Sequence, residues 1–357
     1  MYQALYRSFR PEVFDDLLGQ EHIIKILQNQ IDSGNVGHAY LFCGTRGTGK
    51  TTTARLLAKA LNCTGKGRKP CGCCPECKAI ASGDFLDVVE MDAASNNSVD
   101  DIRALRESVN FPPVSGRTKV YIIDEAHMLS VQAANAFLKT LEEPPKDTVF
   151  ILATTDPNKL PSTILSRCMR LDFRRVPEKK ISESFAKICK EIGVDADPDA
   201  LSLIAANADG SVRDGLSLLE RCVAGSGRLT RDDVLLLLGI AGIETYIEIT
   251  DKVMAKDRAG ALNVLAKVLS EGKEVLQFAK DWVEHIRDLM LIKYADDPQN
   301  MINLSEENIK RLKTQSDRIP MEDISKMITI LSKFINDARY ASKPRILLEL
   351  AIIEMCS

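Results

Sequence analysis

The sequence predicts an α/β domain with a mostly parallel sheet, followed by two regions that are helical throughout. Residues 1–177 alternate short apolar runs with helical patterns, which is typical of parallel strands joined by helices. Residues 178–242 and 243–357 continue the helical periodicity without a strand pattern. The chain of 357 residues also exceeds the size of one typical core. We therefore expect three domains, with boundaries near residues 177 and 242.

The expected elements follow from apolar spacing and from helix-start signals. A helix is predicted at 51–61, directly after a glycine-rich loop, because its apolar residues recur on one face. Asp197 followed by Pro198 predicts a capped helix start. Thr230 is a candidate cap for a helix at 231–238. The strand candidates are the short apolar runs at 38–43, 85–91, 120–123, 149–154 and 169–173.

Composition narrows the class of protein. No run of about 18 apolar residues is present, so no membrane span is expected. The first residues lack the apolar region of a signal peptide. Half of the ten cysteines are scattered along the chain, which indicates a reducing compartment, so we expect a cytoplasmic protein. The net charge of −3 gives no global basic footprint, so any contact with nucleic acid must be local.

Residues 44–51 form a complete phosphate-binding loop, Gly-Thr-Arg-Gly-Thr-Gly-Lys-Thr, between a predicted strand and a predicted helix. Its glycines permit a tight turn that aims backbone N–H groups at phosphate oxygens. Lys50 is expected to contact the β- and γ-phosphates, and Thr51 to coordinate Mg²⁺. The alternative is a chance glycine-rich turn, which the complete motif in this context disfavours. The predicted nucleotide ligands in and after the loop are Gly44, Thr45, Gly47, Thr48, Gly49, Lys50, Thr51 and Thr52.

A second chemical motif follows the strand at 120–123, where Asp124 and Glu125 are adjacent. Asp124 is expected to hold Mg²⁺ through its water shell, and Glu125 to orient and activate the attacking water. Acidic turns after strands are common, so the interpretation depends on the phosphate-binding loop upstream. The next strand ends in Thr154 and Thr155. We select Thr155 as the residue that positions the water or senses the γ-phosphate.

The other five cysteines fall between positions 63 and 77. Cys63, Cys71, Cys74 and Cys77 supply four thiolates, which match a closed tetrahedral structural zinc site. Cys73 is taken as the spare thiol. Disulfide bonds are the alternative, and a reducing compartment disfavours them.

Several segments together resemble one known family. Besides the phosphate-binding loop and the cysteine insert, they are the segments at 6–11, 14–20, 124–129, 138–145, 165–168 and 210–214. In these segments the chain resembles the gamma/tau family of bacterial DNA polymerase III, the ATPase subunits of the clamp loader. The resemblance is dense over residues 1–240 and weak beyond them. It implies an AAA+ fold, in which a P-loop nucleotide-binding domain precedes a small helical lid and a helical collar that oligomerises.

The resemblance also implies roles for single residues. Arg213, early in a helix, would reach the triphosphate of its own chain from the lid. Arg7 and Pro11 would lie near the adenine. Arg167 would project across a subunit boundary to the γ-phosphate of a neighbour, where a guanidinium stabilises the charge that develops in phosphoryl transfer. The alternatives are a solvated surface arginine for Arg213 and a helix-terminal arginine favoured by the dipole for Arg167.

DNA contact is implied at two basic residues, Arg103 and Lys159, because helix N-termini line the DNA in this family. Ordinary surface charge is the alternative for both. Asn96 and Ser98 depart from the family pattern, since basic residues can occur at these positions. Backbone N–H groups and small hydroxyls could contact phosphates instead.

The implied function is ATP-driven loading of the sliding clamp onto primed DNA during replication, with ATP, Mg²⁺ and Zn²⁺ as cofactors. The implied partners are the other clamp-loader subunits, the sliding clamp and primed DNA, with no membrane. Any polymerase activity would belong to the DNA polymerase III holoenzyme. One alternative is a non-hydrolysing structural relative in the same complex, which Glu125 and the complete loop disfavour. Another is a ring helicase of the same fold, which the collar-like last third disfavours.

Overall fold

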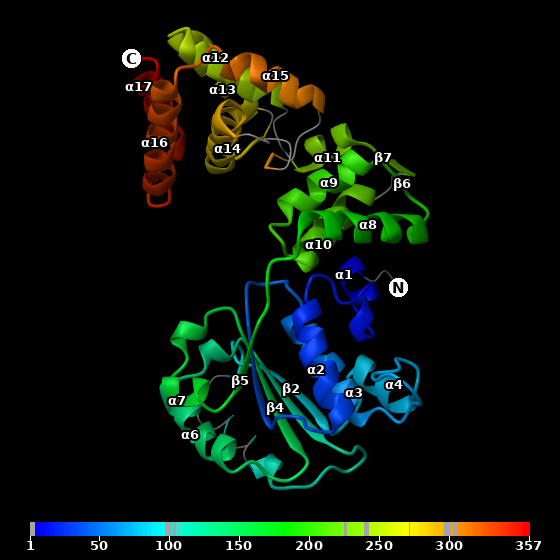
Figure 1. The fold of residues 1–357 in the computed structure, drawn as a ribbon. Coiled ribbons are helices and arrows are strands. Elements are labelled where there is room, and N and C mark those ends of the chain that lie inside the picture. The colour runs from blue at the N-terminus through cyan, green and yellow to red at the C-terminus, as the bar shows by residue number, and fades with distance from the viewer. Residues whose placement is uncertain are drawn as a thin grey trace. The chain divides into compact units, whose positions relative to one another are not determined.

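A five-stranded parallel sheet forms the first part of the chain, as predicted from its alternating pattern (Figure 1). The strand order is β2-β3-β4-β1-β5, so β4 lies between β1 and β3. The carboxyl ends of these three neighbouring strands therefore meet at one edge of the sheet, where ligands bind in open α/β folds. The strands are β1 (Ala39–Cys43), β2 (Val88–Asp92), β3 (Lys119–Asp124), β4 (Thr148–Thr154) and β5 (Met169–Asp172).

The computed structural model describes residues 4–96, 102, 105, 107–224, 227–238, 243–270, 272–295, 301–302 and 306–357. The chain divides into two units, Met1–Arg231 and Asp232–Ser357. The expected boundaries near residues 177 and 242 stay predictions.

Helices cover both faces of the sheet, because side chains alternate along each strand and both sets are apolar. One face packs Tyr40 and Ile122 against α2 (Glu21–Ser33) and α3 (Lys50–Asn62). The other packs Leu41 and Phe150 against α6 (Val131–Glu142) and α7 (Ser162–Leu165). Figure 1 shows these two helix pairs on opposite sides of the strands. The result is a three-layer α/β/α core that fixes the loops at the strand ends.

Short elements connect this framework. The strand predicted at 85–91 begins only at Val88, because residues 85–88 form a turn in which the Val88 N–H donates to the Phe85 carbonyl at 3.1 Å. Asp87 is buried in this turn, and its carboxylate accepts the backbone N–H groups of Val114, Ser115 and Gly116 at 2.6–2.8 Å. The connecting turns and helices are α1 (Leu5–Ser8), η1 (Phe14–Asp16), α4 (Pro75–Ser82), η2 (Ala126–Met128) and η3 (Pro157–Lys159).

The segment after the sheet is mainly helical, but the expectation of no strands there is wrong. β6 (Asp195–Ala196) pairs in parallel with β7 (Arg228–Leu229). Two-residue strands are too short to produce a recognisable alternation. The helix predicted to start at Asp197-Pro198 is present, but the Asp197 side chain does not cap it. The helices are α8 (Glu178–Ile192), α9 (Pro198–Asn207) and α10 (Val212–Val223).

The helices from Ile243 onward pack around one core in which Trp282 is completely buried, and its indole N–H donates to Thr250 Oγ1 at 2.9 Å. Among the helices within the described ranges, none is long and apolar enough to cross a membrane. The helix predicted at 231–238 is present as α11. The helices are α11 (Arg231–Leu238), α12 (Ile243–Met254), α13 (Arg258–Ser270), α14 (Val275–Tyr294), α15 (Glu306–Ser316), α16 (Met321–Ala338) and α17 (Pro344–Met355).

Candidate nucleotide site and metal centre

The phosphate-binding loop leaves β1 and enters α3, and its glycines are required by conformation and by space. Gly44, Gly47 and Gly49 have φ values of 153°, 75° and 102°, which residues with a side chain rarely adopt. A Cβ on Gly44 would lie 2.6 Å from the Phe173 carbonyl oxygen, and one on Gly47 would lie 1.8 Å from Ser211 Oγ. Close packing around the loop therefore fixes these positions as glycine.

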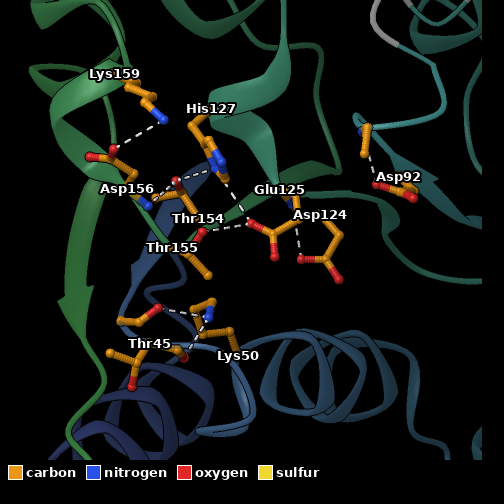
Figure 2. Close-up of polar contacts among 12 residues, drawn as sticks. Thr45, Lys50, Asp92, Asp124, Glu125, His127, Thr154, Thr155, Asp156 and Lys159 are labelled. Atoms are coloured by element: carbon orange, nitrogen blue, oxygen red, sulfur yellow. Dashed lines mark hydrogen bonds and ion pairs between the residues drawn. The ribbon is translucent and has the colours of Figure 1, made fainter. Parts of the chain in front are cut away.

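Lys50 is buried, and its ammonium group is held by the loop itself (Figure 2). Nζ donates to the carbonyl oxygens of Gly44 at 2.8 Å and Thr45 at 2.9 Å. Thr48 Oγ1 donates to the same Thr45 carbonyl at 2.8 Å, while the Thr45 side chain is exposed. Burial lowers the pKa of Lys50, although the carboxylates of Glu125 and Asp124 oppose that shift. A phosphate would be a stronger acceptor for this ammonium than neutral carbonyls are.

Thr51 and Asp124 meet at the carboxyl edge of the sheet. Thr51 Oγ1 donates to Asp124 Oδ2 at 2.7 Å. Asp124 Oδ1 accepts the backbone N–H of Glu125 at 3.0 Å, which fixes the orientation of the carboxylate. Hydroxyl, carboxylate and phosphate oxygens with water are the ligands that Mg²⁺ takes in such sites. This pair therefore has the chemistry and the proximity that a magnesium site requires.

Glu125 reaches toward the end of β4 (Figure 2). Its φ of 46° lies in the left-handed region, which is uncommon for a residue with a side chain. Thr155 Oγ1 donates to Glu125 Oε2 at 3.0 Å. The Glu125 side chain remains one-third exposed. The structure thus places the predicted base and the predicted water-positioning residue in direct contact.

These groups border a cavity of about 690 Å³, a volume suited to a small-molecule ligand. Gly44, Thr45 and Thr155 contribute to the site by contacts rather than to the cavity wall. The wall contains most predicted nucleotide residues, namely Arg7, Pro11, Gly47, Thr48, Gly49, Lys50, Thr51, Thr52, Asp124, Glu125 and Arg213.

Arg213 is brought to the cavity by the start of α10. Ser211 caps this helix through its Oγ, which accepts the Asp214 N–H at 3.2 Å. The Val212 N–H donates to the Gly47 carbonyl at 3.1 Å, so the helix start is bonded to the phosphate-binding loop. The Arg213 guanidinium lies 5.1 Å from the ring centre of Tyr6, a cation–π contact. Arg213 therefore stands at the wall of its own chain's cavity.

Five charged residues of the wall are not among the predicted ligands: Arg10, Asp16, Arg46, Arg55 and Glu90. Arg10 Nε donates to Thr52 Oγ1 at 3.3 Å. Arg55 binds Glu90 through two hydrogen bonds of 2.6 and 2.7 Å. Burial, and then the charge of Arg55, lower the pKa of Arg10 to about 10. An arginine beside another arginine favours an anionic ligand. In the sequence, the position of Arg10 within the family-like segment 6–11 could have indicated its place in the site.

Arg167 is not part of this wall. Its Nη1 donates to the Thr163 carbonyl at 2.7 Å, and its guanidinium pairs with Glu142 at the end of α6. Glu142 lies 25 residues from Arg167 in the sequence and approaches it only through tertiary packing. Helical spacing in the sequence therefore could not indicate this acidic partner. The Arg167 guanidinium is thus held by residues of its own chain, outside the wall of this cavity.

The four cysteines Cys63, Cys71, Cys74 and Cys77 converge at the end of α3 and the start of α4. Their Sγ atoms all lie within 4.8 Å of one another, a spacing compatible with Zn–S bonds of about 2.3 Å. Backbone N–H groups of Cys73 and Cys74 lower the pKa of Cys71 to about 6, which favours the thiolate that a metal needs. Burial raises the pKa of Cys77, and metal binding would have to displace its proton.

Two further observations support this ligand set. Cys74 caps α4, because its Sγ accepts the Cys77 N–H at 3.4 Å. A Cβ on Gly65 would lie only 2.6 Å from Cys71 Sγ, so the glycine leaves room for this thiol. The Cys73 thiol is exposed and lies 3.7 Å from Cys71 Sγ, outside the cluster. The residues therefore fit a tetrahedral zinc site.

The positions considered for DNA contact that the structure describes lie on an exposed turn or next to a strand end. Lys159 is exposed on η3 and lies 3.4 Å from Asp156 Oδ2 (Figure 2). Asn96 donates to the Asp92 carbonyl at 3.1 Å. Arg103 and Ser98 lie outside the described residues.

Three family models match successive parts of the chain. Residues 19–177 match "DNA polymerase III, delta subunit". Residues 180–228 match "DNA polymerase III clamp loader subunit, ATPase lid domain". Residues 229–357 match "DNA polymerase III subunits gamma and tau domain III".

Curated relatives extend over the whole chain. DNA polymerase III subunit tau of Bacillus subtilis is 43% identical over 99% of the chain, which spans only 63% of that relative. DNA polymerase III subunit gamma of Buchnera aphidicola is 37% identical, with 100% of this chain and 99% of the relative covered. A solved structure of the Thermotoga maritima RuvB Holliday junction branch migration motor has a TM-score of 0.51 at 21% identity. That alignment covers 69% of this chain and 79% of RuvB, and supports the AAA+ fold alone.

Proposed function

Since the chain belongs to the family of DNA polymerase III gamma/tau subunits, we propose that it is an ATP-driven motor subunit of a clamp loader. In this role it places the sliding clamp on primed DNA within the DNA polymerase III holoenzyme. The observation that carries the proposal is the hydrogen bond between Thr51 and Asp124 at 2.7 Å. It joins the phosphate-binding loop to the acidic pair at the wall of one cavity.

The residues of this cavity divide the work of phosphoryl transfer to water. Lys50 would exchange its loop carbonyls for β- and γ-phosphate oxygens, and the loop N–H groups would hold the remaining oxygens. Mg²⁺ bound by Thr51 and Asp124 would neutralise charge on the phosphates. Glu125 would accept a proton from the attacking water, which Thr155 would help to orient. Hydrolysis then releases ADP and phosphate.

Two arginines would link hydrolysis to conformation and assembly. Arg213 would leave the Tyr6 ring and bind the triphosphate of its own chain, so that ATP adds a further link between α10 and the loop. Arg167 would leave Glu142 and reach the γ-phosphate of a neighbouring subunit. In related enzymes a guanidinium added at that point stabilises the transition state and raises the rate of hydrolysis by several powers of ten. Hydrolysis would thus depend on a correctly assembled ring.

The other expected components complete the proposal. Arg7 and Pro11 border the base-binding end of the cavity. Zinc bound by the four cysteines would stabilise the α3–α4 connection without taking part in catalysis. Arg103 and Lys159 would contact the DNA backbone, and the helices beyond residue 242 would bind other loader subunits. The protein would act in the cytoplasm, where replication takes place in bacteria.

Two alternatives differ from this proposal, one in the site and one in the response to DNA. A non-hydrolysing relative in the loader would not need Glu125 in contact with Thr155, which is the arrangement present at 3.0 Å. A ring helicase of this fold would respond to an unpaired strand alone. A loader would respond to the clamp together with primed DNA.

Glu125→Gln provides the test. The variant is expected to bind ATP with unchanged affinity and to lose hydrolysis by about a hundredfold or more, since the amide cannot accept the proton. Titration calorimetry and single-turnover hydrolysis would measure the two properties in a reconstituted loader. Unchanged hydrolysis would contradict the assignment of the base. Wild-type stimulation by unpaired DNA, without any added effect of the clamp, would contradict the loader function.

A further inference from the structure

His127 contacts the hydrolysis centre, yet the mechanism above gives it no part. It belongs to η2, the single turn that directly follows Glu125. Its imidazole Nδ1 lies 3.1 Å from Thr154 Oγ1 and 3.4 Å from Glu125 Oε2 (Figure 2). The His127 side chain is only 10% exposed. Solvent therefore competes little for either contact.

Thr154 gives the imidazole a fixed partner. It is the last residue of β4 and is completely buried. Its Oγ1 also accepts the backbone N–H of Asp156 at 3.1 Å. A hydroxyl held by the strand and by this N–H cannot move far. The position of the imidazole is consequently set by the central part of the sheet.

The carboxylate determines where the imidazole carries its hydrogen. With a lone pair on Nδ1, two electron-rich atoms of His127 and Glu125 would face each other at 3.4 Å. With the hydrogen on Nδ1, the imidazole attracts both Glu125 Oε2 and Thr154 Oγ1. We therefore assign the hydrogen to Nδ1 from the surrounding network.

Glu125 Oε2 thus has one hydrogen-bond donor and one longer polar contact, which come from two elements. Thr155 Oγ1 donates to it at 3.0 Å from the end of β4, and the His127 imidazole approaches from η2. The terminal torsion of a glutamate is broad when unrestrained. The hydrogen bond from Thr155 and the 3.4 Å contact of His127 restrict this rotation and leave Oε1 to accept a proton from water. A general base works only when its accepting atom is held within reach of that proton.

We propose that His127 is a positioning residue for ATP hydrolysis, which orients the Glu125 carboxylate through the approach of its Nδ1–H to Oε2. This inference rests on the proposed function. His127 touches neither the nucleotide nor the water, and it transfers no proton. Its effect passes entirely through Glu125, with Thr154 holding the ring in place.

The test compares three substitutions of His127 in the reconstituted loader. His127→Asn places an amide N–H near the position of Nδ1, whereas His127→Gln places one near Nε2. His127→Ala removes the donor. Met128→Ala is the control, because Met128 is the next residue of η2 and its side chain is 46% exposed. Single-turnover hydrolysis and ATP affinity are measured for each protein.

His127→Ala and His127→Gln are expected to lower single-turnover hydrolysis by about ten- to a hundredfold, the size expected when a polar contact to a charged group is lost. ATP affinity should not change. His127→Asn should restore most of the lost rate, and Met128→Ala should behave as wild type. A simple packing role would not distinguish Asn from Gln in this way.

Three outcomes would overturn the inference. Equal rates for the Asn and Gln variants would remove the role of Nδ1. An ATP affinity that falls in parallel with the rate would indicate a structural role. Wild-type hydrolysis in the Ala variant would show that Glu125 needs no such support. If the wild-type protein itself failed to hydrolyse ATP in the loader, the proposed function would be refuted. That result differs from the three outcomes above, in all of which the wild-type protein is active.

Discussion

Replacement of Arg167 by alanine separates the role of this residue in its own chain from its role in a complex. Within the chain, Arg167 binds the Thr163 carbonyl and the carboxylate of Glu142. In the proposed loader, it would serve the nucleotide of a neighbour. Arg167→Ala is therefore expected to fold, to bind ATP and to assemble normally, and to fail in stimulated hydrolysis.

The two effects differ greatly in size. The Arg167 and Glu142 side chains are 33% and 47% exposed, and an ion pair this accessible contributes about 0–1 kcal/mol. Its loss should shift the thermal midpoint by no more than about 4 °C. Loss of an arginine that acts on the transition state lowers hydrolysis by about 10³–10⁵-fold, or about 4–7 kcal/mol. Damage to the fold could not account for an effect of that size.

The assay is single-turnover hydrolysis in loader assembled with primed DNA and clamp. Glu142→Gln is the matched control, because it breaks the same ion pair and keeps the arginine; it should hydrolyse ATP like wild type. Mixed assemblies give a second reading. A Lys50→Ala chain should supply its Arg167 to the intact nucleotide site of an Arg167→Ala neighbour and restore some activity. If every mixture stays inactive while assembly is intact, or if Arg167→Ala alone is fully active, the reasoning is refuted.

The remaining predictions concern the phosphate-binding loop and the cysteine cluster. Lys50→Ala should weaken ATP binding by about a hundredfold or more, since charge-assisted hydrogen bonds to the phosphates are lost; unchanged affinity in titration calorimetry would contradict the nucleotide site. Cys77→Ser should lose zinc and destabilise the protein, because structural zinc contributes folding energy, whereas Cys73→Ser should retain the metal. Elemental analysis decides both, and zinc loss from Cys73→Ser would show that the four thiolates are wrongly chosen.

The sheet and the phosphate-binding loop could be predicted because local rules determine them. Strands buried on both faces appear as continuous apolar runs, and glycines with positive φ mark the turn that phosphates require. The magnesium pair was also within reach. Thr51 and Asp124 follow strands whose carboxyl ends share one edge in any open parallel sheet.

The contacts that sequence could not predict depend on tertiary packing or on unusual backbone conformation. Glu142 pairs with Arg167 across 25 residues. Glu125 takes a left-handed backbone conformation that no local sequence pattern predicts. This conformation brings its carboxylate to His127 and Thr155. The location of Arg10 in the cavity wall could not be predicted either, because its segment precedes the sheet and contributes to the cavity only after folding.

The most direct test of the account is transfer of a labelled sliding clamp to primed circular DNA by a loader assembled with this chain. Wild-type protein with ATP is expected to leave closed clamps on the DNA. Glu125→Gln should bring clamp and DNA together and fail to release them, and Lys50→Ala should bind neither stably. Clamp transfer that proceeds equally without ATP, or equally with Lys50→Ala in place of wild type, would contradict the claim that this chain is the motor.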